Sequence, residues 1–132
     1  MDLQLLVLLY QIHNNMKQTN FVYFNAAASS DGADDGSMYN SNALLAMNST
    51  AAGTATMYFK AWNGHNDAPD DIVLTVDATG GDDADRINRI KAMDAMVDKV
   101  NTVNKQGFVT AFSEIENVKP GGITGIAITV DA

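Results

Sequence analysis

The residues DIVLTVDATGGDDADRINRI, numbers 71–90, carry two periodicities in succession. From Asp71 to Ala78 apolar and mostly polar residues alternate, which is typical of a β-strand with one face in the core. From Asp82 to about Asn104 apolar residues recur at spacings of three and four, which predicts a long amphipathic helix. The side chains expected in the core are Ile72, Leu74 and Val76 in the strand, and Ile87, Ile90, Ala92, Met93, Met96, Val97, Val100 and Val103 in the helix.

The turn ATGGDDAD, residues 78–85, joins the strand to the helix, an order also found in phosphate-binding loops. Here no lysine follows the paired glycines, and three aspartates would face the anion. Two like charges about 4 Å apart repel by about 4 kcal/mol at an effective dielectric of about 20, which disfavours phosphate. We therefore expect the aspartates to cap the helix and complement its dipole, with ion pairs Asp82–Arg86 and Asp85–Arg89.

Five further stretches have compositions that favour strands. They are Asn20–Ala27, Ala43–Thr50, Thr54–Trp62, Gly107–Ile115 and Gly122–Ala132, and the core face of the third should hold Ala55, Met57, Phe59 and Ala61. Ser29–Ser37 is rich in turn formers and is expected to be a loop. Residues 19–132 therefore predict a single α+β domain. We expect an antiparallel-leaning sheet of five or six strands with the long helix of about residues 82–104 packed on it. A short N-terminal helix precedes the sheet.

The composition bounds the partners of the chain. It has 132 residues, a formal net charge of −8 and no cysteine. An acidic surface repels nucleic acid and anionic lipid, because binding a phosphate backbone needs clustered basic residues. The missing cysteines exclude disulfides, thiolate metal sites and cysteine nucleophiles. We expect no nucleic-acid partner, no membrane partner and no cofactor.

The N-terminal segment MDLQLLVLLYQIHNNMKQ, residues 1–18, is apolar, and we expect it to be neither a membrane anchor nor a secretory signal. Its apolar run is far shorter than the roughly 20 residues that cross a bilayer, and it lacks the basic start of a secretory signal. It is either a helix buried against the domain or a neighbouring subunit, or a start assigned too early, with Met16 as the true beginning. Leu5, Leu8, Leu9 and, in a strand, Trp62 are the residues expected to contact a partner, which points to a homo-oligomer.

Two acidic loops, 29–37 and 63–71, are the candidate metal sites. Asp31 and Asp35 can be aligned with a calcium-binding EF-hand loop, but Ala33 and Asn42 occupy two of its ligand positions. A hard-cation site could still use Asp31, Asp34 and Asp35, or His65 with Asp67. Glu114 and Glu116 could serve as paired carboxylates only if a cleft brings them together. The sequence contains no recognisable catalytic constellation, so an enzyme is not expected.

The order NFVYFNAA, TMYFKAW, DIVLTVDA and ITGIAITVDA, found within residues 20–132, resembles small uncharacterised proteins of marine bacteriophages, cyanophages among them. The resemblance implies a virion or accessory component, in the host cytoplasm or in an assembled particle. It contains no catalytic motif and carries over no functional residue. The function expected is therefore that of a non-enzymatic structural or interaction protein, and the alternative is a small-ligand or divalent-metal-binding module that uses the acidic loops.

Overall fold

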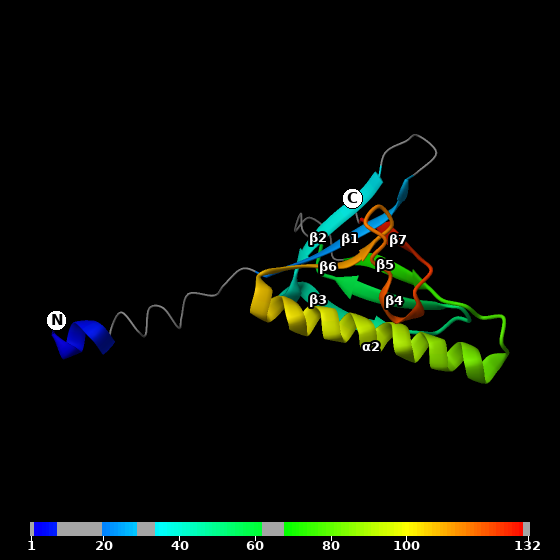
Figure 1. The fold of residues 1–132 in the computed structure, drawn as a ribbon, viewed down its shortest axis with the longest axis horizontal. Helices are drawn as coiled ribbons and strands as arrows, with labels where there is room; N and C mark the ends of the chain where they lie inside the picture. The colour runs from blue at the N-terminus through cyan, green and yellow to red at the C-terminus, as the bar shows by residue number, and fades with distance from the viewer. Residues whose placement is uncertain (1, 8–19, 29–33, 62–67, 131–132) are drawn as a thin grey trace.

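A computed structural model describes residues 2–7, 20–28, 34–61 and 68–130 (Figure 1). Within these ranges the chain forms a short N-terminal helical turn at residues 3–7, seven strands, one long helix and two 3-10 turns. The elements are β1 (Phe21–Ala28), β2 (Asp34–Asn40), η1 (Ser41–Ala43), β3 (Leu44–Asn48), β4 (Thr54–Phe59), β5 (Asp70–Thr75), α2 (Asp82–Gln106), β6 (Phe108–Ser113), η2 (Pro120–Gly122) and β7 (Gly125–Thr129). The predicted α+β class is confirmed.

The strands form two sheets. The first has the order β2-β1-β6, with β1 antiparallel to β2 and parallel to β6. The second has the order β3-β4-β5-β7 and is antiparallel throughout. The sequence indicated one sheet of five or six strands, whereas the structure divides seven between two sheets. The additional strand is β2. Its residues 34–37 belong to a stretch whose composition predicts a loop, but pairing with β1 gives them extended structure.

The two sheets meet over a buried aromatic cluster. The Tyr39 ring stacks on Phe59 with ring centroids 4.5 Å apart, and Phe24 meets Phe59 edge-on at 5.7 Å. Phe24 and Tyr39 belong to the three-stranded sheet, and Phe59 belongs to the four-stranded sheet. The core residues expected in β4, in β5 and just after β5 are also buried: Ala55, Met57, Phe59, Ile72, Leu74 and Val76. Alternation in these strands therefore predicted the core face correctly.

A buried hydrogen bond also joins the sheets, because the hydroxyl of Tyr39 donates to Oδ2 of Asp70 over 2.8 Å. Burial, followed by the hydrogen bond to Asp70, raises the pKa of Tyr39 far above its ordinary value near 10. Below pH 10 the phenol is protonated in both the folded and the unfolded chain. Above it the unfolded chain loses the proton first, so the free energy of unfolding should fall by up to about 1.4 kcal/mol per pH unit.

Denaturant unfolding of the wild type and Tyr39→Phe from neutral to strongly alkaline pH measures this contribution. At neutral pH the variant should be less stable by about 1–3 kcal/mol, because the buried Asp70 loses the Tyr39 donor. The difference in unfolding free energy should narrow as the pH rises above about 10. If the difference in unfolding free energy between the wild type and Tyr39→Phe stays constant across that pH range, the Tyr39 phenol does not contribute to stability in this way.

Helix α2 runs along both sheets (Figure 1) and buries Ala92 and Met96 in the shared core. Met93 and Val100 are partly buried against the same core. The predicted stripe was wrong for Ile87, Ile90 and Val97, which are exposed. The apolar residues of α2 span a wider arc than the sheets can cover. The arc that faces inward is therefore narrower than the periodicity suggested. The side chain of Val103 lies outside the described part of the chain.

The small 3-10 turn η2 presses its backbone against α2 at Gly121. A Cβ atom on Gly121 would lie 2.6 Å from Cβ of Ala95, 2.9 Å from the carbonyl oxygen of Lys91 and 3.3 Å from Cα of Ala92. Gly121 also has a φ of +65°, in the left-handed region that favours glycine. The absence of a side chain at this position is thus what lets α2 approach the chain that leads into β7.

Candidate functional site

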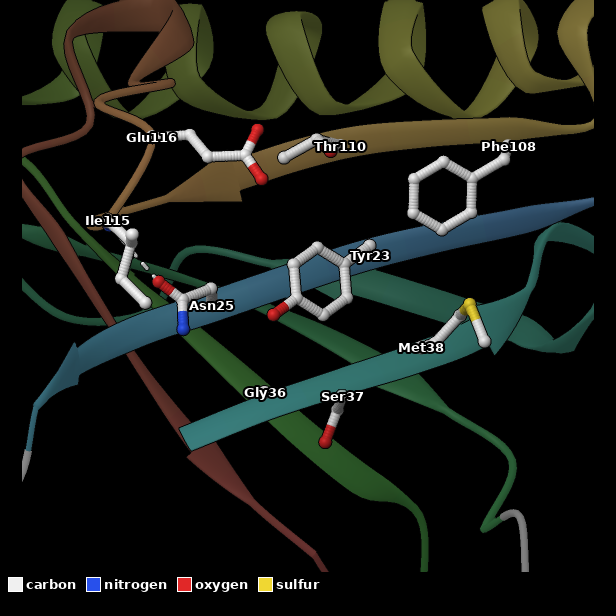
Figure 2. Close-up of a pocket in the computed structure, with 9 residues that line it drawn as sticks. All are labelled: Tyr23, Asn25, Gly36, Ser37, Met38, Phe108, Thr110, Ile115 and Glu116. Carbon is white, nitrogen blue, oxygen red and sulfur yellow. Dashed lines mark hydrogen bonds between the residues drawn. The ribbon is translucent and has the colours of Figure 1, made fainter. Parts of the chain in front are cut away.

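An open groove of about 700 Å³ lies on the outer face of the three-stranded sheet (Figure 2). This face points away from the core, because Val22 and Phe24 of β1 are the side chains that point inward. The groove is lined by Tyr23, Asn25, Gly36, Ser37, Met38, Phe108, Thr110, Ile115 and Glu116. All three strands and the turn after β6 contribute to it.

Aromatic rings form one part of the groove. Tyr23 and Phe108 are 6.2 Å apart between ring centroids, with an interplanar angle of 25°. They come from neighbouring parallel strands, in which Phe21 pairs with Phe108 and Tyr23 with Thr110. Gly36 on the other side of β1 leaves room for the Tyr23 ring, since a Cβ there would lie 2.9 Å from the Tyr23 hydroxyl. The result is a broad apolar platform with Met38 at its edge (Figure 2).

A hydrogen-bonded turn closes one end of the groove. Ser113 and Val118 exchange backbone hydrogen bonds of 2.9 Å in both directions. The amide of Ile115 and the hydroxyl of Ser113 donate to Oδ1 of buried Asn25, over 3.2 Å and 3.3 Å. Asn25 therefore fixes the turn on the end of β1, which places Ile115 and Glu116 beside the groove (Figure 2).

The groove is apolar at its edges and has a small set of polar groups. Met38 is 48% exposed, Phe108 50% and Ile115 65%. Glu116 is the one carboxylate among the lining residues, because Glu114 turns to an ion pair of 2.9 Å with Lys119. The two glutamates thus do not form the paired carboxylates of a glycosidase in the groove. Exposed apolar side chains around an open groove are typical of a contact surface for another macromolecule.

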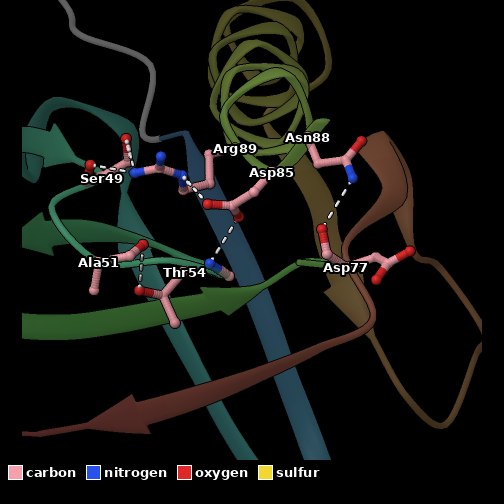
Figure 3. Close-up of polar contacts among 8 residues, drawn as sticks. Ser49, Ala51, Thr54, Asp77, Asp85, Asn88 and Arg89 are labelled. Atoms are coloured by element: carbon pink, nitrogen blue, oxygen red, sulfur yellow. Dashed lines mark hydrogen bonds and ion pairs between the residues drawn. The ribbon is translucent and has the colours of Figure 1, made fainter. Parts of the chain in front are cut away.

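The 78–85 turn has a structural role (Figure 3). Asp85 is buried, and its Oδ1 accepts a 2.8 Å hydrogen bond from the backbone amide of Gly53. Its Oδ2 lies 3.3 Å from Nε of Arg89, whose Nη1 donates to the carbonyl of Ser49 over 2.7 Å. This network ties the first turn of α2 to the connection between β3 and β4. Because the buried carboxylate of Asp85 already occupies this turn and is paired, the turn does not bind phosphate.

The contacts made by the aspartates at the start of α2 differ in part from those predicted. Asp82, Asp83 and Asp85 lie in the first turn, where they complement the helix dipole. The Asp85–Arg89 pair is confirmed, but Arg86 pairs with Asp83 over 2.8 Å rather than with Asp82. The carboxylate of Asp85 reaches Gly53 outside the helix.

The other predicted site residues are only partly described. Leu5 is exposed, and Asp34 and Asp35 begin β2 with side chains that are not described. Outside the described residues lie Asp31, His65, Asp67, Leu8, Leu9 and Trp62. Among the residues described, no group of three or more His, Asp or Glu side chains could hold a metal ion. Sequence reasoning does not identify the groove residues Met38, Phe108 and Ile115. The one signal in the sequence is Ile115, an apolar residue between two glutamates, which indicates an exposed apolar side chain.

No protein-family model, curated protein or solved structure matches this chain. The resemblance to marine phage proteins accordingly stays a prediction. Across the described ranges no helix has the length and hydropathy needed to span a membrane.

Proposed function

We propose that this chain is a non-enzymatic structural or interaction protein that associates with further copies of itself. The observation that supports the proposal is the exposure of Met38, Phe108 and Ile115 around one groove on an otherwise lightly charged, acidic protein. Burying such side chains gains about 25 cal/mol per Å² of apolar area. Taken with the phage resemblance, the proposed role is that of a virion or accessory component in an assembled particle.

Net charge gives this association a characteristic salt dependence. Two copies with a net charge of −8 repel each other, so the contact must be driven by apolar burial. Salt screens this repulsion, because the Debye length falls from about 30 Å at 0.01 M to about 3 Å at 1 M. Association should therefore strengthen as salt is added. An interface built on ion pairs would weaken under the same change.

Light scattering of the purified protein, measured at increasing protein concentration and at low and high salt, tests the proposal. The molar mass should exceed that of one chain and rise with salt. Ile115→Asp should lower it, whereas Ile90→Asp on α2 should not, because Ile90 is an exposed isoleucine away from the groove. A wild-type molar mass of one chain at every concentration and salt would refute self-association.

Gly36→Ala should alter the groove while leaving the fold intact. The new Cβ would lie 2.9 Å from the hydroxyl at the far end of the Tyr23 side chain, which can rotate away. The free energy of unfolding should change by less than about 1 kcal/mol, since alanine is less costly than glycine in a strand. The displaced ring should weaken self-association by about tenfold, which corresponds to about 1.4 kcal/mol. Unchanged association would show that the Tyr23 side of the groove is not part of the contact.

A further inference from the structure

The helical turn at residues 3–7 is apolar and has no covered side. Leu3, Leu5, Leu6 and Val7 are exposed by 72%, 48%, 52% and 48%. Asp2 begins this turn: its carbonyl accepts from the amide of Leu6 over 3.1 Å, and its Oδ1 accepts from the amide of Gln4 over 3.2 Å. Such a cap stabilises the helical conformation, so part of the ordering cost of binding is already met.

The spacing of these side chains fits a helix that docks into a groove. Leu3, Leu6 and Val7 stand at positions i, i+3 and i+4, which share one face of a helix. Peptide helices that bind apolar grooves present anchors at this spacing. Residues 3–7 carry no charged side chain, so the face that would dock is uncharged. The groove beside Phe108 offers an aromatic and methionine-lined platform of matching chemistry.

We infer that the groove on the three-stranded sheet binds residues 3–7 of a second copy of this chain. The inference rests on the proposed function and names its partner and contact. In the part of the chain that the structure describes, both apolar surfaces are exposed, so each is free to be buried by another copy. When two copies associate, the helical turn of one is buried in the groove of the other, so a single contact covers both apolar surfaces.

Reciprocal exchange makes this arrangement closed. Each copy donates one helical turn and accepts one, which is the self-complementary pattern of a two-fold dimer. A stable interface buries about 1,200–2,000 Å² in total, more than one helical turn supplies. Exchange of two turns doubles the area that a single docked turn would bury. The groove at each end then holds Leu3, Leu6 and Val7 of the other copy.

Introduced cysteines can test the contact without interference, because the chain has none of its own. Two single variants of the full chain, Leu6→Cys and Ile115→Cys, are given different mass tags, mixed and oxidised. A disulfide needs Cα atoms about 4.4–6.8 Å apart, so it reports proximity directly. The control replaces Ile115→Cys with Leu45→Cys on β3, an exposed leucine on the other sheet. Light scattering of Leu3→Asp/Leu6→Asp is measured alongside.

The mixed Leu6→Cys and Ile115→Cys sample should give the covalent heterodimer as its main product, at least about tenfold above the Leu45→Cys control. The Leu3→Asp/Leu6→Asp variant should have the molar mass of one chain. If the wild type associates but the cross-link does not exceed the control, the contact is wrong and the proposed function stands. If a Leu6→Cys/Ile115→Cys double variant forms only an intrachain disulfide, the helix binds its own chain and the inference is overturned. A wild type that remains a single chain refutes both.

Discussion

Replacing Gly121 with alanine should destabilise the fold by about 2–5 kcal/mol. The new Cβ would meet the carbonyl oxygen of Lys91 at 2.9 Å and Cβ of Ala95 at 2.6 Å. Backbone atoms of a long helix cannot move aside as a flexible side chain can, so η2 must separate from α2. The left-handed φ of +65° adds the cost of placing an L side chain there. Denaturant unfolding followed by circular dichroism measures the loss.

Gly122 provides the matched control for this prediction. Its φ is +74°, but a Cβ at that position would have no atom within 4 Å. Gly122→Ala should therefore cost only the backbone part, about 1–2 kcal/mol. Adding Ala95→Gly to Gly121→Ala should recover some stability, because it removes one of the two closest contacts. Equal losses for Gly121→Ala and Gly122→Ala would mean that η2 does not press on α2.

Asp85→Ala should destabilise the fold by about 2–4 kcal/mol, although the residue lies in a run of surface-like aspartates. Asp85 is buried, and its removal leaves the amide of Gly53 without its 2.8 Å acceptor. The guanidinium of Arg89, which is also largely buried, loses the carboxylate that balances its charge. Unpaired buried groups lose their solvation without compensation, which explains the size of the effect.

Asp83→Ala is the control for Asp85→Ala. Asp83 lies in the same first turn as Asp85, but its pair with Arg86 is exposed to solvent, so its loss should cost no more than about 1 kcal/mol. Asp85→Asn should fall between the two, since the amide oxygen can still accept from Gly53 while the charge is lost. The three free energies of unfolding are measured under one set of conditions. Similar values for Asp83→Ala and Asp85→Ala would contradict the network around Arg89.

The sequence predicted the parts of the fold that depend on local periodicity. Alternation in β4 and β5 identified their buried faces, and the length and start of α2 followed from its spacing. β2 could not be recognised in this way, because its Asp, Gly and Ser residues favour turns until β1 supplies a pairing partner. The exposed position of Ile90 likewise depends on how much of α2 the sheets cover, which no local pattern specifies.

The sequence could not predict the groove, for a related reason. Met38 and Phe108 stand on strands far apart in the chain, and they face one groove only because β1 lies between β2 and β6. Strand order is a property of the tertiary fold. Leu5 is predicted as a contact residue from its apolar neighbours, and it is exposed in the structure.

The central claim is that the outer face of the three-stranded sheet is a contact surface between copies of this chain. NMR of the wild type labelled at its methionine methyl groups tests it most directly. Met38 lies half-exposed at the groove, whereas Met57 and Met96 are fully buried in the core. Raising the protein concentration should shift or broaden the Met38 methyl signal and leave those of Met57 and Met96 in place. A Met38 signal that does not change with concentration would contradict the account.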